Sequence, residues 1–234
     1  MNIVLAGYGE VGRAVNGLFS IVHDIEIHDP RKGFYASGSA PGLLVTFPYS
    51  ENFIDRVKMY AEVCETKFVI IFSTVPIGTT RQIDNAVHCP VEGRHPNLQK
   101  SMYVWKWVVG GKNELAERFF YEASITPIVY PEPEWTEFLK LSSTLNYGLN
   151  IEWARYCKEV SDKIGMPYCA LNEYTAGYNA LYSGLNEPGI KRYNLTPPGG
   201  KIGGHCILPN AEMLQNIFPN PLIEYILKVN KEKT

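Results

Sequence analysis

The chain has no hydrophobic run approaching the roughly 20 residues that a membrane-spanning helix needs, and its start lacks the features of a signal peptide. Its 22 basic and 24 acidic residues give a net charge of only -2, without the excess typical of proteins that bind nucleic acid or anionic membranes. The five cysteines are scattered and form no C-x-x-C pair, which argues against a disulfide framework or a metal site. We therefore expect a cytoplasmic protein with no metal, nucleic-acid partner or membrane partner.

The start of the chain carries a dinucleotide-binding pattern. A short apolar run at residues 3–6 predicts a buried strand, and residues 13–19 have helical spacing. Between them stands a G-x-G-x-x-G motif, whose glycines allow a tight turn, the close approach of a pyrophosphate and close helix packing. The predicted cofactor-binding residues of this motif are Gly7, Tyr8, Gly9, Glu10, Val11 and Gly12.

An acidic residue completes this pattern. Asp29 follows a predicted strand at residues 25–28 and lies 17 residues after Gly12. An acid near this spacing accepts hydrogen bonds from the adenosine ribose of NAD and would repel the additional phosphate of NADP. Arg31 and Lys32 stand nearby, so NADP stays an alternative cofactor. The alternative interpretation is a glycine-rich turn beside an ordinary surface aspartate.

Alternating strand and helix patterns continue to about residue 130. We expect strands at residues 42–47, 67–72, 87–91, 107–111 and 125–129, and helices at residues 51–64 and 114–122, with another helix starting at residues 79–83. Such repeats predict a doubly wound sheet that binds ligands outside the carboxyl ends of its strands. The residues that follow the strand at 67–72 would then face the cofactor, although capping of a helix by a threonine is the alternative. These residues are Ser73, Thr74 and Val75.

A short acidic linker with two prolines, at residues 131–134, predicts a boundary between a domain of residues 1–130 and one of residues 131–234. Residues 135–164 predict one long helix, ended by Gly165 and Pro167. Shorter helices should follow at residues 170–185 and 210–217. The expected fold class is therefore α/β, with an N-terminal Rossmann-like doubly wound sheet followed by a smaller, mainly helical domain.

A cysteine behind two glycine pairs, Cys206, lies where the backbone can turn sharply and nothing bulky crowds the sulfur. Together with the dinucleotide pattern, this predicts an oxidoreductase with a cysteine nucleophile. The alternative is a turn beside a small core residue. His205 could equally be an acid–base group or a pocket wall, and Lys140, near the start of the long helix, could equally be a surface cation.

Six motifs, in order along nearly the whole chain, resemble those of the nucleotide-sugar (UDP-glucose/GDP-mannose) dehydrogenase family, close to its UDP-N-acetylmannosamine branch. They occupy residues 7–12, 73–80, 95–98, 108–111, 137–140 and 203–207. The resemblance implies a nucleophilic Cys206, an active-site Lys140 and a Thr74 at the cofactor and water site. It implies that an alcohol of a small-molecule substrate, a nucleotide sugar or a similar compound, is oxidised with NAD through a thioester. It also implies a homodimer formed through the long helix.

The chain departs from the family's pattern at three positions. It has Pro96-Asn97 where the family has Pro-Glu, Asn210 where the family has an aspartate, and Thr144 where the family has an asparagine. An amide cannot act as a general base, and such a group contributes on the order of 10²–10⁴ in rate, so thioester hydrolysis should be slow. The chain also stops where the family's UDP-binding domain begins, which implies a truncated, diverged member. Asn210 stays among the catalytic candidates, and the substrate-binding candidates are Asn97, Thr144, Gly203, Gly204 and His205.

Three functions therefore stay open. The first is a dehydrogenase in which both Cys206 and Lys140 are catalytic. The second is a single hydride transfer, as in the related 3-hydroxyacid and 6-phosphogluconate dehydrogenases, with Lys140 catalytic and Cys206 structural or in contact with substrate. The third is a non-catalytic NAD-binding module with a decayed active site.

Overall fold

The computed structural model describes residues 1–93, 97–202 and 206–232. The chain forms two compact units, Met1–Leu141 and Ser142–Thr234. The division lies inside one helix, α5 (Pro133–Lys163), and therefore further along the chain than the acidic linker at residues 131–134.

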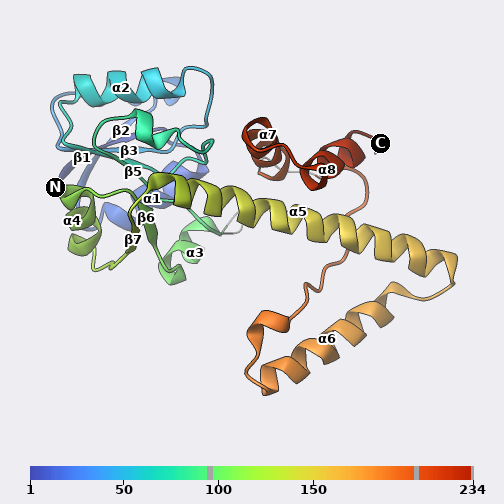
Figure 1. Ribbon diagram of the computed structural model, residues 1–234. Coiled ribbons are helices and arrows are strands. Elements are labelled where there is room, and N and C mark those ends of the chain that lie inside the picture. The colour runs from blue at the N-terminus through green and yellow to red at the C-terminus, as the bar shows by residue number, and fades with distance from the viewer. Residues whose placement is uncertain (94–96, 203–205, 233–234) are drawn as a thin grey trace. The chain divides into compact units, whose positions relative to one another are not determined.

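The first unit is a seven-stranded sheet with helices on both faces (Figure 1). The strand order is β2-β1-β3-β4-β5-β6-β7, and every pairing is parallel except that between β5 and β6. The strands are β1 (Asn2–Ala6), β2 (Asp24–His28), β3 (Gly42–Val45), β4 (Phe68–Ile71), β5 (Ala86–His88), β6 (Val108–Gly110) and β7 (Ile128–Tyr130). The helices are α1 (Glu10–Phe19), α2 (Phe53–Val63), α3 (Leu98–Val104), α4 (Glu114–Glu122) and the start of α5. The predicted α/β fold class is confirmed.

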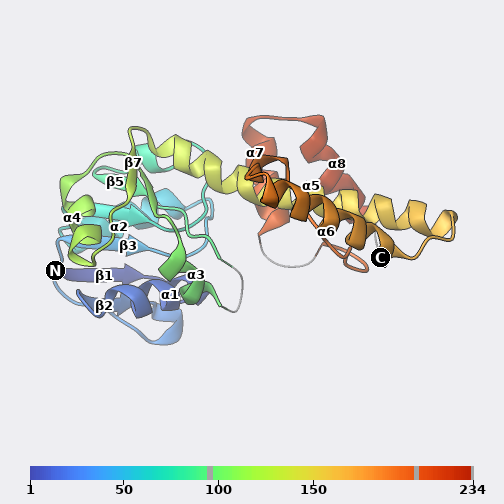
Figure 2. The same ribbon diagram turned by 90° about the horizontal axis from the view of Figure 1, so that it is seen from below.

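The sheet is covered on both faces because its central strands are apolar on both faces. In β1, Ile3 and Leu5 join a core shared with α1, α3 and α4. Val4 and Ala6 alternate with them and pack into a second core with α2. Figure 2 shows α3 beside α1, on the same side of the sheet. Aromatic rings fill much of the first core: the centroid of the Phe19 ring lies 4.6 Å from that of Phe119.

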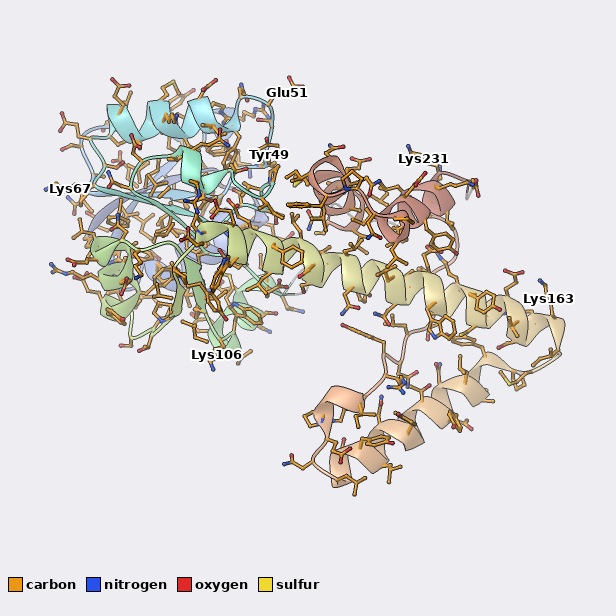
Figure 3. The ribbon with its side chains drawn as sticks, in the orientation of Figure 1. Tyr49, Glu51, Lys67, Lys106, Lys163 and Lys231 are labelled. Carbon is orange, nitrogen blue, oxygen red and sulfur yellow. The ribbon has the colours of Figure 1, made fainter. Side chains whose placement is uncertain are left out.

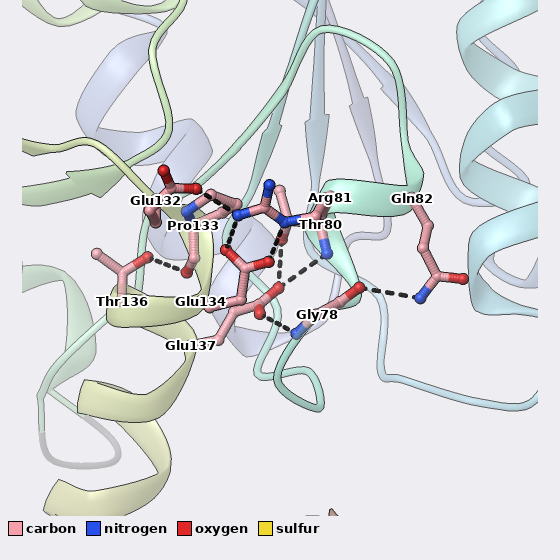
Figure 4. A network of polar contacts seen from close by, with 9 residues as sticks. All are labelled: Gly78, Thr80, Arg81, Gln82, Glu132, Pro133, Glu134, Thr136 and Glu137. Atoms are coloured by element: carbon pink, nitrogen blue, oxygen red, sulfur yellow. Dashed lines mark hydrogen bonds and ion pairs between the residues drawn. The ribbon is translucent and has the colours of Figure 1, made fainter.

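Local structure differs from expectation after β4. The helix predicted to start at residues 79–83 is wrong, because Thr80–Gln82 forms only one 3-10 turn, η2. The carboxylate of Glu137 accepts the backbone N–H groups of Gly78 and Thr80 (Figure 4), and Ile83 returns to an extended conformation. Strand β5 ends before Pro90, which has no N–H to donate to a ladder.

The second unit is helical. It contains the rest of α5, then α6 (Tyr168–Gly184), α7 (Ile207–Ile217) and α8 (Pro221–Glu232). Lys163 stands in the last turn of α5, where a cation is favourable (Figure 3). Gly165 follows with φ of 69°, as a helix-ending glycine should, and Pro167 precedes α6. The predicted long helix and its Gly-then-Pro end are confirmed.

One apolar cluster of the second unit consists of the buried residues Ile151, Ile202, Ile207 and Ile226. Helix α6, all of which is described, has no buried residue. Across the described ranges, no helix is long and apolar enough to cross a membrane. Within the same ranges, no group of three or more His, Cys, Asp or Glu side chains could hold a metal ion.

Candidate active site

The glycine motif forms a tightly packed turn at the carboxyl end of β1. Gly7 has φ of 94°, and its N–H donates to the carbonyl oxygen of His28 at 2.9 Å. A Cβ built on Gly12 would stand 2.2 Å from the carbonyl oxygen of Gly7, so no side chain fits there. The hydroxyl of Thr46 donates to that same oxygen at 2.6 Å. The first and third glycines therefore hold β1, α1 and the end of β3 together.

The middle glycine of the motif has an open side. Apart from Gly9 itself and its two chain neighbours, no atom of the described chain lies within 4 Å of a Cβ built on Gly9, and Gly9 directly precedes α1. The N–H groups of the first turn of a helix have no intrahelical partners, and they form a favourable place for phosphate oxygens. Glu10 occupies that first turn, and Tyr8 and Val11 pack partly against the core. A closed turn with one open face fits the pyrophosphate of a dinucleotide.

The acid that was predicted to contact a ribose lies against this turn. Asp29 Oδ2 accepts the backbone N–H of Tyr8 at 2.8 Å, and the Lys32 ammonium donates to the Tyr8 carbonyl. Asp29 is half-buried at the end of β2, whereas Arg31 and Lys32 are exposed. The sequence-predicted Asp29 and the glycine motif are thus brought together by parallel pairing of β1 and β2.

The three residues after β4 have different surroundings. The Ser73 hydroxyl donates to the carbonyl oxygen of Phe47 at 2.6 Å, and Val75 is fully buried in the second core. Thr74, between them, is half-buried. Ser73 and Val75 therefore anchor the loop, and Thr74 is the member of the trio that reaches the surface.

A buried histidine supports this loop from β5. Burial lowers the pKa of His88 to about 3, so its imidazole is neutral. Its Nε2 lies 3.3 Å from the carbonyl oxygen of Ser73, and its Nδ1 lies 2.9 Å from the hydroxyl oxygen of Thr136 in α5. Because a carbonyl can only accept, the proton is on Nε2 and Nδ1 accepts from Thr136.

A lysine and a carboxylate meet beyond the end of β5. The ammonium of Lys140 donates to the carbonyl oxygen of Val91 at 2.7 Å, and it lies 3.3 Å from Glu92 Oε1. The two side chains are 17% and 26% exposed, so the pair is shielded but still reachable. Sequence reasoning identified Lys140 and missed Glu92. The signal for Glu92 was an acid shortly after an apolar strand and Pro90.

The second unit carries Cys206 immediately before α7. Cys206 is exposed, and its carbonyl accepts the N–H of Asn210, which is buried one turn further on. A Cβ on Gly148 of α5 would stand 2.7 Å from Ile207 Cγ2, so the start of α7 packs closely on α5. Thr144 lies half-buried on α5, one turn before Gly148.

The chain segment before Cys206 is held by buried polar groups. Arg155 donates to the carbonyl oxygen of Gly200 and pairs with the Glu152 carboxylate, and the side chain of Asn230 accepts the N–H of Ile202. Three predicted residues, Gly203, Gly204 and His205, lie outside the described residues, as do His95 and Pro96 of another motif. Asn97 is exposed and directly precedes α3.

These features define a Rossmann-like α/β fold followed by a helical unit, and the likeness to solved structures confirms this fold. UDP-D-ManNAc dehydrogenase from Pyrococcus horikoshii superposes with a TM-score of 0.74 at 17% identity, covering 99% of this chain and 68% of that one. 3-Hydroxyisobutyrate dehydrogenase from Mycobacterium tuberculosis gives 0.75 at 14% identity, covering 99% of this chain and 92% of that one.

Sequence comparison points to a particular group within this class. No family model matches the chain. UDP-N-acetyl-D-mannosamine dehydrogenase from Methanocaldococcus jannaschii is 27% identical over 172 residues, covering 68% of this chain and 37% of that protein. The corresponding protein from Methanococcus vannielii is 25% identical over 154 residues, covering 61% and 33%. The chain spans 33–37% of the length of these relatives. The resemblance to nucleotide-sugar dehydrogenases is confirmed, and the chain is a distant relative of UDP-N-acetyl-D-mannosamine dehydrogenases.

Proposed function

We propose that the protein is an NAD-dependent oxidoreductase that oxidises an alcohol of a sugar nucleotide or a similar small molecule. One observation carries the proposal. The open glycine turn follows β1, Asp29 follows β2, and Glu92, which pairs with Lys140 of α5, follows β5. These three strands belong to the part of the sheet, β1 to β5, in which every pairing is parallel. The carboxyl ends of parallel strands lie at one edge, which is where ligands bind in such sheets.

The residues at this edge have separable roles. The N–H groups at the start of α1 would hold the pyrophosphate, and Asp29 would accept hydrogen bonds from the ribose. When bound, NAD supplies the acceptor for a hydride. Lys140 would donate a hydrogen bond to the substrate oxygen, where negative charge develops, and Glu92 would take up the proton released.

Cys206 would extend the oxidation from aldehyde to acid. Its thiolate forms a C–S bond with the aldehyde carbon, and the carbonyl electron pair moves to oxygen. A second molecule of NAD would accept a hydride from this adduct and leave a thioester, and attack by water on the thioester would release the acid and the free thiol. Asn210 stands where an acid–base group would speed that last step, so the thioester should be long-lived.

The decisive experiment measures NADH at 340 nm with NAD and a panel of nucleotide sugars, sugar phosphates and 3-hydroxyacids. We expect two NADH per substrate, with the second lost in Cys206→Ser and both lost in Lys140→Ala. A Cys206→Ser variant that still yields two NADH would contradict the role of the cysteine. NADH binding without turnover across the panel would support a non-catalytic module.

A single hydride transfer is the second candidate, and one observation favours it. The M. tuberculosis 3-hydroxyisobutyrate dehydrogenase is matched over 92% of its length, compared with 68% for the P. horikoshii protein. In this case Lys140→Ala abolishes turnover, Cys206→Ser leaves it intact, and one NADH forms per substrate.

The choice of NAD over NADP rests on Asp29. Its half-buried carboxylate, bonded to the glycine turn, would repel a phosphate on the ribose. We expect wild-type protein to bind NADH more tightly than NADPH in fluorescence titrations, and Asp29→Asn to narrow the difference. Equal affinity of the wild type for both would refute the assignment.

We also propose that the protein is a homodimer through its helical unit. Helix α6, 17 residues and therefore about 25 Å long, leaves Tyr174, Leu181 and Leu185 74%, 55% and 57% exposed. A stable dimer buries about 800 Å² per partner, which an apolar face of this length can supply together with α5. Light scattering at micromolar concentration should report twice the chain mass, and a monomeric mass would contradict the proposal.

A further inference from the structure

A buried carboxylate in α5 holds the loop that follows β4. Glu137 has no exposed surface, and it accepts three hydrogen bonds (Figure 4). They come from the N–H of Gly78 at 2.6 Å, the N–H of Thr80 at 2.8 Å and the hydroxyl of Thr80 at 2.6 Å. One side chain of α5 therefore fixes the far end of the loop that carries Thr74.

The near end of the same loop is held by the neighbouring residue of α5. Thr136 contacts His88 Nδ1, and His88 Nε2–H donates to the carbonyl of Ser73, where the loop begins. Consecutive residues of one helical turn thus reach both ends of the loop, one directly and one through His88. Lys140 stands three residues after Glu137 on the same helix.

We propose that Glu137 is a positioning residue, whose carboxylate holds the loop of residues 73–80 in one geometry against the helix that carries Lys140. The inference rests on the proposed function as an NAD-dependent oxidoreductase, and on the expectation from the sequence that Ser73, Thr74 and Val75 face the cofactor. Both ends of the loop are tied to α5 in addition to the anchors of Ser73 and Val75, so Thr74 and Lys140 keep a fixed relation while substrate and cofactor bind and leave.

The neighbouring ion pairs do not supply this restraint. Arg81 pairs with Glu132 and Glu134, and the Arg81 and Glu132 side chains are 58% and 44% exposed. Exposed pairs contribute little, whereas loss of a buried acceptor leaves its donors unsatisfied. Burial raises the pKa of the Glu137 carboxyl, and the hydrogen bonds from Thr80 and Gly78 oppose that rise.

The test compares Glu137→Gln with a matched control, Glu134→Gln, which removes an ion-pair partner from the same helix turn without touching residues 78–80. Hydrogen exchange of the peptide covering residues 73–80 is measured without ligand. The Kd for NADH is measured by fluorescence at a temperature well below the midpoint of thermal unfolding. An amide presents an NH₂ group to one of the three donors, so we expect about tenfold faster loop exchange and about tenfold weaker NADH binding. Glu134→Gln should stay within about twofold of wild type in both measurements.

Wild-type exchange and wild-type Kd in a folded Glu137→Gln protein would overturn the proposal. If Glu137→Gln does not fold, Thr80→Val is used, because it removes a single hydroxyl donor at similar volume. We then expect faster loop exchange and weaker NADH binding, both by smaller factors than in Glu137→Gln. Wild-type values in Thr80→Val would then overturn it. If wild-type protein binds no NADH, the proposed function fails, and loop exchange alone decides the role of Glu137.

Discussion

Mild acid should destabilise the first unit through His88. The imidazole is buried and neutral, with a pKa lowered to about 3 from an ordinary value of 6.5. The unfolded chain therefore binds a proton that the folded chain does not, and stability falls as the pH drops below 6.5. The slope approaches about 1.4 kcal/mol per pH unit, so between pH 7.5 and pH 5 the free energy of unfolding should fall by about 2 kcal/mol. The loss is complete only near pH 3.

The matched variant is His88→Gln, which does not titrate and keeps an N–H for the Ser73 carbonyl. Urea unfolding is followed by tryptophan fluorescence at both pH values for both proteins. Burial also lowers the pKa of His23, so His23 contributes a loss of stability in the same direction in both proteins. The difference between the two proteins therefore isolates the contribution of His88. We expect the stability gap between wild type and His88→Gln to shift by about 2 kcal/mol in favour of the variant at pH 5. A gap that does not change with pH would refute the reasoning.

Three further substitutions probe other parts of the chain. Gly12→Ala places a Cβ 2.2 Å from the Gly7 carbonyl oxygen, and it should lower stability by about 1–3 kcal/mol and weaken NADH binding, checked by thermal melts and fluorescence titration. Arg155→Met leaves the buried Glu152 carboxylate without its partner, and it should cost about 3–5 kcal/mol in urea unfolding, with partial recovery in the double variant with Glu152→Met. Gly148→Ala places a Cβ 2.7 Å from Ile207 Cγ2, so it should lower the stability of the second unit by about 1–3 kcal/mol, measured by urea unfolding.

Strands and helices were predictable where the local sequence pattern matches the burial of the same residues in the folded chain. Apolar runs such as residues 68–72 are buried on both faces, so their strand character follows from composition alone. The helix expected at residues 79–83 fails because its decisive partner, Glu137, stands far along the chain, and a distant carboxylate leaves no local signal. Helix α3 was not predicted because its seven residues span only about two turns, too few to establish a helical period, and α8 was not predicted either.

The candidate site shows the same distinction. The contact between Asp29 and the glycine turn was predictable, because strand adjacency and a fixed spacing bring the two together. The link from Ser73 through His88 to Thr136 was not predictable, because it joins three segments whose neighbourhood exists only in the folded sheet. His88 is fully buried in β5, and both of its ring nitrogens have polar partners.

The carboxylate beside Lys140 is not at the position that motif comparison predicts. Matching Pro96-Asn97 to the family's Pro-Glu puts an amide at the site and implies that acid–base chemistry is impaired. Glu92 instead lies 3.3 Å from the lysine, and the lysine also binds the carbonyl of Val91, the residue before it. One residue separates Pro90 from Glu92, so a search for adjacent proline and glutamate passes over the pair. Because a carboxylate stands in contact with the lysine, the asparagine at position 97 does not by itself argue against proton transfer in the first unit.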